Sequence, residues 1–315
     1  MTASMTARFS ALAIVLAAGG LAAAVAAGAA QVQAQPATCM AACVETRFVD
    51  VDGVRYAYRV IGPEGGVPVV FMQRFRGTMD EWDPAFVDVV ASQRRVILFD
   101  NVGVARTNGT SPPRLADWAE NAAGFINALG YDQVDLLGFS LGGYMAQELT
   151  LRRPDLVRRL VLAGSGAGYV EGANVRATAI TVATKPVNDE ADFLYLFFKD
   201  TPTSQAAGRE HLARLNARRD AFAERVSAQS WQAMLAAASD VSTPETSLLT
   251  RASQIRQPVL IANGDEDIMI PTYQSWALSQ AMPNARLIIY PDSGHAFLFQ
   301  YPRLFGEEVV RFLAD

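Results

Sequence analysis

A serine between two glycines, in the sequence Gly-Phe-Ser-Leu-Gly at 138–142, is the first group whose surroundings suggest chemistry. An apolar run precedes it at 133–139, and a helical pattern follows at 141–153. Small residues on both sides permit the sharp strand-to-helix turn that presents a serine hydroxyl above a sheet edge. The helix N-terminus adds free N–H groups and a positive dipole end. This spacing predicts Ser140 as a nucleophile, with the Leu141 N–H as an oxyanion donor.

A serine nucleophile needs a base, and the chain offers only two histidines. His295 lies in a Ser-Gly-rich turn just after the last apolar run, and we predict that it is the base. The alternative for His295 is a capping or core role. His211 lies in an arginine-rich helical segment, where we expect a solvated surface position.

An orienting acid is also needed to hold the base in the correct tautomer. The run at 257–264 is followed directly by three acidic residues, Asp265, Glu266 and Asp267. The position after a strand suits an orienting acid. Any of the three can supply it, and the other two are expected to face solvent or shape the turn.

The elements that must position these residues alternate between strand-like and helix-like patterns. A tight turn at Asp52-Gly53 predicts a β-hairpin over 46–62. Amphipathic segments at 115–129 and 141–153 predict helices. Short apolar runs typical of strands covered on both faces occur at 67–73, 94–100, 133–139, 157–164, 257–264 and 285–291. The alternation predicts an α/β fold, with a mostly parallel central sheet and helices on both faces.

The alternation of strand and helix patterns is interrupted once, between 164 and 257, where no comparable apolar run typical of a strand occurs. The interval holds the run Phe-Leu-Tyr-Leu-Phe-Phe-Lys at 193–199 and helical patterns on either side of 220. We predict a helical lid insertion at about 168–252, over the carboxyl edge of the sheet where ligands bind in open α/β sheets. Its apolar residues are expected mostly to pack, and secondarily to line a pocket for an apolar group.

With these motifs in place, the sequence resembles the α/β-hydrolase superfamily, in its lidded group of esterases and lipase-like hydrolases. The resemblance spans about Thr46 to Leu313. Four markers stand in order: FMQRFRGTMDEWDP, FDNVGVARTNG, GFSLGG, and NGDEDIMIP followed by DSGHAF. The resemblance implies the triad order Ser140, Asp267, His295, because the family places its acid last in a G-x-x-D pattern.

The resemblance also implies a second oxyanion donor, the backbone N–H of Phe75. In the family this residue follows a His-Gly pair, whereas here Gln73 and Arg74 precede it. Arg74 adds bulk and charge, so it is expected to reach an acidic substrate group or an internal carboxylate such as Asp100. A backbone donor needs no particular side chain, so the oxyanion hole can survive the substitution.

These residues predict an acyl-enzyme mechanism on an ester-type bond of a small, apolar substrate, with no cofactor. Other reactions of the same triad remain open: cofactor-free perhydrolysis, carbon–carbon bond hydrolysis, aminopeptidase and acyltransferase chemistry. Haloalkane dehalogenases and epoxide hydrolases are disfavoured, because they use an aspartate where Ser140 stands. A non-catalytic ligand-binding protein on this fold is the alternative from another class.

The composition of the chain excludes some classes of binding partner. The 315 residues carry a net charge of −5 with only isolated arginine pairs, which disfavours nucleic-acid binding. Two distant histidines and no ligand cluster make a metal site improbable. The two cysteines, Cys39 and Cys43, can close a short disulfide loop in an exported protein.

The first 34 residues are expected to be a signal peptide. An uncharged, Ala-rich stretch at 11–30 follows Arg8, and small residues stand at Val32 and Ala34, where a signal peptidase would cleave. The remaining chain, 35–315, is then the hydrolase domain, periplasmic or secreted and free of the membrane. An uncleaved membrane anchor is the alternative, because about 20 apolar residues can span a bilayer.

Overall fold

The computed structural model describes residues 40–216 and 226–314. The expected signal peptide, its cleavage site and Cys39 lie outside the described residues. Cys43 is described and is disulfide-bonded. No helix within the described ranges is long and apolar enough to span a bilayer.

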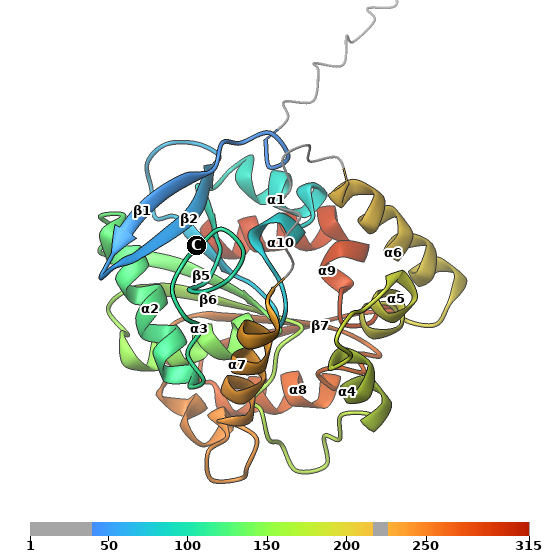
Figure 1. Cartoon of the computed structure of the whole chain (residues 1–315). Helices are drawn as coiled ribbons and strands as arrows, with labels where there is room; N and C mark the ends of the chain where they lie inside the picture. Colours follow the sequence, from blue (N-terminus) through green and yellow to red (C-terminus); the bar gives the residue numbers. More distant parts are fainter. Residues whose placement is uncertain (1–39, 217–225, 315) are drawn as a thin grey trace, which may run out of the picture. The chain divides into compact units, whose positions relative to one another are not determined.

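A single sheet runs through the described part of the chain, in the order β1-β2-β4-β3-β5-β6-β7-β8 (Figure 1). The predicted hairpin and all six predicted strands are present, and the predicted fold class is confirmed. The run at 285–291 forms an edge strand that is only partly buried, so the expectation of cover on both faces is wrong for this strand. Strands β1 and β2 pair antiparallel, β2 joins β4 antiparallel, and the remaining neighbours are parallel. The strands are β1 Arg47–Val51, β2 Val54–Ile61, β3 Val69–Met72, β4 Val96–Phe99, β5 Val134–Phe139, β6 Val157–Ala163, β7 Val259–Gly264 and β8 Ala285–Tyr290.

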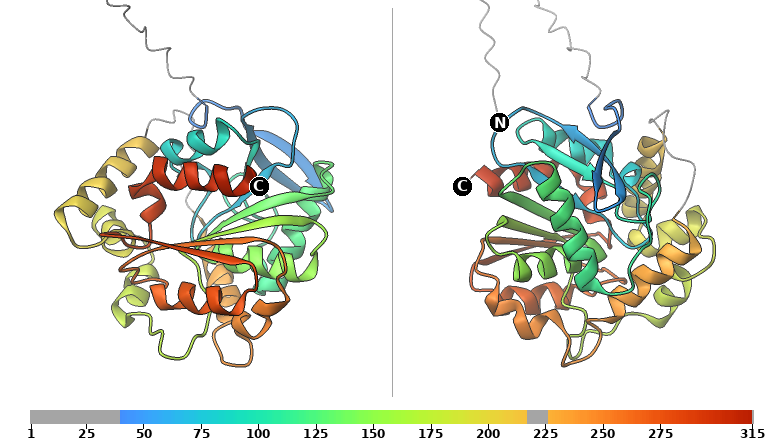
Figure 2. Two further views of the ribbon diagram at one scale, coloured as in Figure 1. Left: turned by 180° about the vertical axis from the view of Figure 1, so that it is seen from behind. Right: turned by 60° about the vertical axis from the view of Figure 1, so that its left-hand side comes forward.

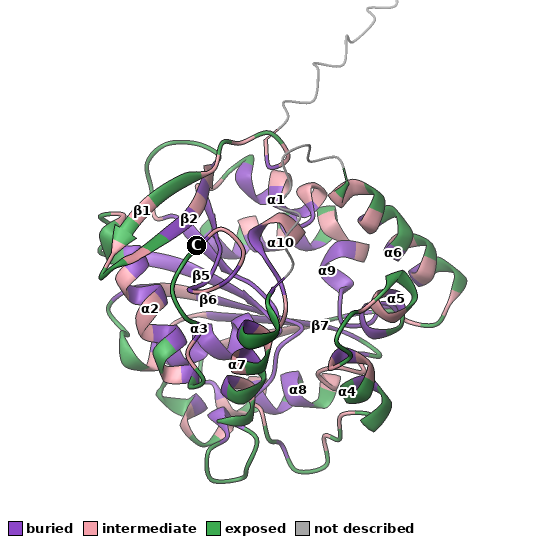
Figure 3. Cartoon of the chain, viewed as in Figure 1, coloured by how far each residue is buried: buried purple, intermediate pink, exposed green. Residues whose placement is uncertain are grey.

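The central strands read as continuous apolar runs because both faces of the sheet are covered. In β3, Val69 and Phe71 point into one core cluster, while Val70 and Met72 point into the other. This alternation follows from the two-residue period of a strand. Figure 3 shows the inner strands buried along their length.

Helices cover both faces of the sheet (Figure 2). Helices α1 and α10 pack against each other in one layer, and α2 and α3 pack together in the other. Asp83 caps the start of α1 by accepting the Ala85 N–H at 2.9 Å. The helices of these layers are α1 Pro84–Ala91, α2 Leu115–Ala128, α3 Leu141–Arg152, α8 Thr272–Ala281, α9 Phe297–Gln300 and α10 Pro302–Ala314, and a short 3-10 helix η1 spans Met79–Glu81.

The interval between β6 and β7 contains helices and no strand among its described residues. We call 168–216 together with 226–252 the lid segment. Side chains of Asp189, Thr201 and Ser227 accept backbone N–H groups at the starts of α5, α6 and α7. The helices are α4 Ala177–Ala183, α5 Glu190–Phe197, α6 Pro202–Leu215 and α7 Ala228–Ser239, followed by the 3-10 helix η2 Leu248–Gln254.

The expectation that His211 lies on a solvated surface is wrong. His211 in α6 is 1% exposed, and its Nδ1 lies 2.8 Å from Asp83 Oδ2. Its ring stacks on Phe299, with 4.3 Å between the ring centroids and an interplanar angle of 5°. Arg214, one turn further along α6, donates to the same carboxylate at 2.6 Å. The face of α6 that carries His211 and Arg214 is therefore a contact face with the core, whereas Arg209 of the same helix is exposed. The buried carboxylate of Asp83 is stabilised there by hydrogen bonds and by the charge of Arg214.

Candidate active site

Ser140 occupies a strained turn between β5 and α3. Its backbone has φ 55° and ψ −122°, a conformation that non-glycine residues rarely adopt. The turn is held by the Ser140 N–H, which donates to Ala163 O at 3.0 Å, and by the Ser165 hydroxyl, which donates to Ser140 O at 2.9 Å. This is the sharp strand-to-helix turn that the flanking glycines predicted, and it lies at the carboxyl end of a central strand.

The glycines that flank Ser140 are needed for close backbone approach. A Cβ on Gly138 would overlap the carbonyl of Gly142, and a Cβ on Gly142 would overlap the carbonyl of Met72. The second overlap is informative, because Met72 ends β3 and leads into the predicted oxyanion loop. The start of α3 and this loop are therefore packed backbone against backbone, which only glycine permits.

His295 and Asp267 form a buried pair at the same sheet edge. The distance between His295 Nδ1 and Asp267 Oδ2 is 2.7 Å, and both side chains are almost fully buried. Asp267 Oδ1 accepts the N–H groups of Met269 and Ile270, each at 2.8 Å. These bonds fix the carboxylate so that it can hold the imidazole in one tautomer, leaving Nε2 as the nitrogen free to act on a proton.

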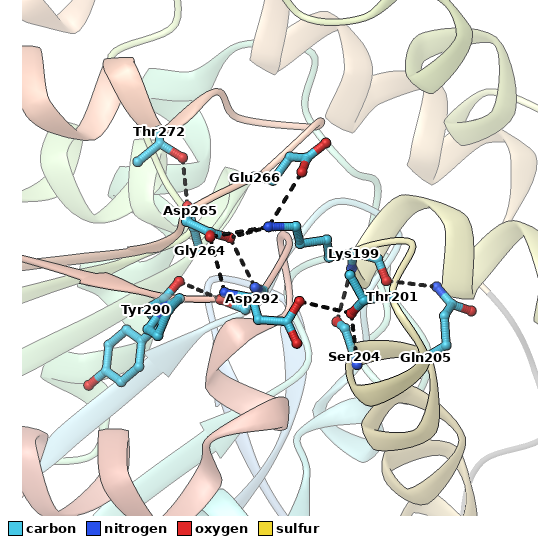
Figure 4. Close-up of polar contacts among 12 residues, drawn as sticks. Lys199, Thr201, Ser204, Gln205, Gly264, Asp265, Glu266, Thr272, Tyr290 and Asp292 are labelled. Carbon is cyan, nitrogen blue, oxygen red and sulfur yellow. Dashed lines mark hydrogen bonds and ion pairs between the residues drawn. The ribbon is translucent and has the colours of Figure 1, made fainter.

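The two other acidic residues of the turn have separate contacts. Asp265 accepts the N–H groups of Asp292 and Ser293, each at 3.0 Å, and so braces the loop that leads to His295 (Figure 4). Lys199, from the turn between α5 and α6, pairs with Asp265 at 3.2 Å and with Glu266 at 3.5 Å. Asp265 thus shapes the turn as expected and also ties the lid segment to the histidine loop.

The two predicted oxyanion donors follow β3 and begin α3. Neither the Phe75 N–H nor the Leu141 N–H donates a hydrogen bond to another described residue. Leu141 is the first residue of α3, where a helix leaves its N–H groups without an intrahelical acceptor. Both donors are therefore available to a bound oxygen.

Arg74 is buried, with 7% exposure, and its carboxylate partner is Glu81 rather than Asp100. Its Nη2 donates to Glu81 Oε1 at 2.7 Å, and its Nη1 donates to the carbonyl of Phe75 at 2.9 Å. Asp100 instead accepts the Met79 N–H at 2.8 Å, and burial raises its pKa to about 6. Glu81 lies within reach of Arg74 because it is only seven residues away, on the short helix that follows the loop.

A cavity of about 550 Å³ opens above these groups. Ser140, His295 and Phe75 line it, and Leu141 does not. The Ser140 hydroxyl makes no hydrogen bond to His295 in the structure; such bonds often tighten only when substrate is bound. Two charged pairs lie at the lining: Arg74 pairs with Glu81, and Asp80 pairs with Arg59 and Arg106 behind it. Its apolar lining is Phe193, Leu196, Phe197, Leu212, Leu215, Val226 and Met269.

The described residues contain no group of three or more His, Cys, Asp or Glu side chains placed to hold a metal ion. The functional groups gathered at the cavity are instead a hydroxyl, an imidazole with its carboxylate, and free N–H donors. Such a set can carry out nucleophilic acyl transfer.

Comparison with known proteins identifies the family. A family model described as the alpha/beta hydrolase fold matches residues 67–302, and the chain belongs to that family. The 2-hydroxymuconate semialdehyde hydrolase of Pseudomonas putida is 30% identical over 228 residues, which cover 70% of this chain and 78% of that protein. This likeness to a hydrolase indicates that the chain is an enzyme of the hydrolase class.

Solved structures show the same architecture. An alpha/beta hydrolase fold protein from Chitinophaga pinensis is 34% identical, with a TM-score of 0.81, and the match covers 87% of this chain and 98% of that one. The enol-lactonase from Burkholderia xenovorans has a TM-score of 0.68 at 21% identity, covering 85% of this chain and all of that one, which shows a shared fold.

The sequence did not point to several residues that shape the site. Gln73 Oε1 accepts the Arg74 N–H at 2.8 Å, and Gln73 Nε2 donates to Thr78 O at 2.9 Å, so this side chain braces the predicted oxyanion loop from within. Arg76 anchors the same loop to the lid segment. The only signal was the replacement of the family's His-Gly pair, which removes a small residue and requires new supports.

Proposed function

We propose that the protein is a carboxylesterase-like serine hydrolase that cleaves an ester-type bond through an acyl-enzyme on Ser140. The observation that carries the proposal is the buried His295–Asp267 pair, which shares a cavity with the strained Ser140 turn. His295 takes the serine proton as Ser140 attacks the carbonyl, and then protonates the leaving group. The same base next activates water to release the acid.

The N–H groups of Phe75 and Leu141 are proposed to bind the oxyanion that forms during both steps. Removing one such donor typically costs about 3 kcal/mol of transition-state stabilisation. Asp267 acts by orientation, since its second oxygen is already held by two backbone N–H groups. No group beyond these residues and water is needed for the reaction to balance.

The apolar lining supports a small apolar acyl or alcohol group as the substrate. Its aromatic part is made by Phe193 and Phe197 of α5, whose rings stack 4.3 Å apart. Esters of butyrate, octanoate and phenylacetate should therefore be cleaved with higher kcat/KM than an ester of a dicarboxylic acid. A preference for the charged acyl group would contradict this assignment.

The deciding experiment compares the wild-type protein with Ser140→Ala in p-nitrophenyl ester hydrolysis and in labelling by a fluorophosphonate. Ser92→Ala, at the exposed end of α1, is the matched control. Turnover and labelling should both vanish in Ser140→Ala and persist in the control. A folded wild-type protein that shows neither would refute the triad and favour a ligand-binding role.

A second candidate is hydrolysis of a substrate related to 2-hydroxymuconate semialdehyde, because a relative of that name is 30% identical. Consumption of that compound can be followed by its absorbance, alongside the ester panel. If kcat/KM for it exceeds that for every ester, the ester assignment yields to this one.

We also propose that the protein is exported. The uncharged stretch at 11–30 supports this, as does the disulfide at Cys43, since disulfides persist in oxidising compartments. N-terminal sequencing of protein recovered from the periplasm or the medium should find a start near residue 35. Recovery with residue 1 retained in a membrane fraction would favour the anchor.

A further inference from the structure

Three consecutive residues of the loop 73–78, which we call the oxyanion loop, contact the lid segment. The guanidinium of Arg74 lies over the ring of Phe197 in α5, 4.9 Å from its centroid. The ring of Phe75 meets Trp231 of α7 edge to face, with centroids 6.4 Å apart. The loop that presents a proposed donor is therefore sandwiched between the sheet edge and lid helices.

Arg76 makes the most extensive of these contacts. Its Nη1 donates to the carbonyls of Ala183 at 3.2 Å and Lys185 at 2.6 Å, and its Nη2 donates to that of Pro186 at 3.0 Å. Ala183 is the last residue of α4, where a helix leaves oxygen atoms without partners and carries the negative end of its dipole. Lys185 and Pro186 lie in the turn that follows this helix. One guanidinium thus satisfies three acceptors of the lid segment.

The backbone N–H and the guanidinium of Arg76 also contact a second lid helix, α7. Its N–H donates to Met234 Sδ at 3.3 Å, and its guanidinium lies 5.1 Å from the ring centroid of Trp231. Its φ of 57° is the left-handed conformation that favours glycine. An arginine retained in a glycine-like conformation, and bonded to α4 and α7 together, indicates that its side chain has a specific task.

We propose that Arg76 is a positioning residue for the oxyanion hole. By joining the loop to the lid segment, it holds the neighbouring Phe75 N–H at the site where the oxyanion forms. The inference rests on the proposed serine hydrolase function. Its consequence is that a displacement of the lid segment would also displace the Phe75 N–H, because the same guanidinium is bonded to one and adjoins the other.

The test is Arg76→Gly, which removes the side chain and keeps the left-handed backbone accessible. We expect kcat for p-nitrophenyl butyrate to fall about 10- to 100-fold, less than the loss of a whole donor, with KM changed less than about threefold. Affinity for a trifluoromethyl ketone, which forms a tetrahedral adduct with Ser140, should fall in parallel. Affinity for 1-butanol, a neutral ligand without a carbonyl or carboxylate oxygen, should not, because it does not use the oxyanion donors.

A second measurement does not depend on turnover. Amide hydrogen exchange in the peptide 74–79 should become about tenfold faster in Arg76→Gly. Arg303→Gln, which removes an exposed arginine paired with Glu307 on α10, should leave exchange, kcat and adduct affinity unchanged. Arg76→Lys keeps one donor and should recover only part of the adduct affinity, since it lacks the planar fork.

The outcomes separate the two proposals. If the wild-type enzyme is active and Arg76→Gly keeps its kcat and adduct affinity, only the positioning role is refuted. If kcat, 1-butanol affinity and melting temperature fall together without a selective loss of adduct affinity, Arg76 is merely structural and the inference fails. If the wild-type protein neither turns over esters nor is labelled, the proposed function fails, and unchanged exchange would refute the tether as well.

Discussion

Two histidine–aspartate pairs lie in this molecule, and their local geometry is nearly the same. Nδ1 to Oδ2 is 2.7 Å for His295–Asp267 and 2.8 Å for His211–Asp83. All four side chains are almost fully buried. Aromatic rings flank both imidazoles, at 5.0 Å from Phe139 for His295 and 4.3 Å from Phe299 for His211. The pair by itself therefore does not define a catalytic site.

The surroundings separate the two pairs. His295 lines the cavity that Ser140 also lines, and among the described residues Asp267 is held by two backbone N–H groups besides its histidine. His211 does not line that cavity, and Asp83 also pairs with the guanidinium of Arg214 and caps α1. One pair is open to a reacting group, and the other joins the lid segment to the core. Access to a nucleophile makes the difference.

The largest expected difference between the pairs is in kcat. His295→Gln should lower kcat for an ester by at least about 10⁴-fold, because the proposed nucleophile loses its base. His211→Gln should keep kcat within about tenfold. Steady-state kinetics on both variants, at a temperature where circular dichroism shows each folded, provides the comparison. Equal losses in the two variants would place both pairs in the chemistry.

The second effect is on stability and concerns Asp83. Asp83→Ala removes a buried carboxylate from between His211 and Arg214, which should lower the free energy of unfolding by about 3–5 kcal/mol. Urea denaturation followed by tryptophan fluorescence measures this. Asp267→Ala is the matched substitution and should chiefly lower kcat. If Asp83→Ala leaves the unfolding curve unchanged, this pair does not hold the lid segment to the core.

The third effect is on the pH dependence of stability. Burial lowers the pKa of His211 below its ordinary value of 6.5. Burial alone would raise the pKa of Asp83, but hydrogen bonds from His211 and Arg214 outweigh it and lower the pKa. For each group the unfolded state then binds more protons, so its stabilisation is lost as pH falls, below about 6.5 for His211 and below about 3.8 for Asp83.

Melting temperatures measured between pH 7.5 and 5 test whether stability falls as pH falls. The wild-type protein should lose stability over this range, with a slope from His211 of at most about 1.4 kcal/mol per pH unit. His211→Gln should flatten the slope. A slope that is the same in the variant would assign the titration to another group.

The smallest effect concerns Arg214, which pairs with Asp83 beside His211. Arg214→Lys keeps the charge beside Asp83 but loses the planar fork that donates through Nε and Nη2. The free energy of unfolding should fall by about 1 kcal/mol. Arg303→Lys, in an exposed pair on α10, should change it by less than about 0.5 kcal/mol. Equal effects would mean that burial adds nothing to the Asp83 contact.

Much of the proposed site was predictable because it depends on short-range patterns. The six apolar runs, the turn around Ser140, and the positions of Asp267 and His295 directly after strands are all local features. A parallel sheet brings the carboxyl ends of its strands to one edge, so their order along the chain is enough to gather these residues. The identity of the acid needed the family pattern, since three neighbouring carboxylates satisfy the local requirement equally.

Only the tertiary structure decided the fate of groups whose partners are distant in sequence. His211 meets Asp83 across 128 residues, and Arg76 meets Met234 across 158. The arginine-rich composition of α6 predicted a solvated helix. Composition does not distinguish an arginine that is solvated from one that pairs with a buried carboxylate. The sequence by itself determined the sheet and the residues at its edge. Packing of the lid segment decided which histidine faces the cavity and which lid residues Arg76 contacts. Burial and long-range pairing are properties of the assembled fold.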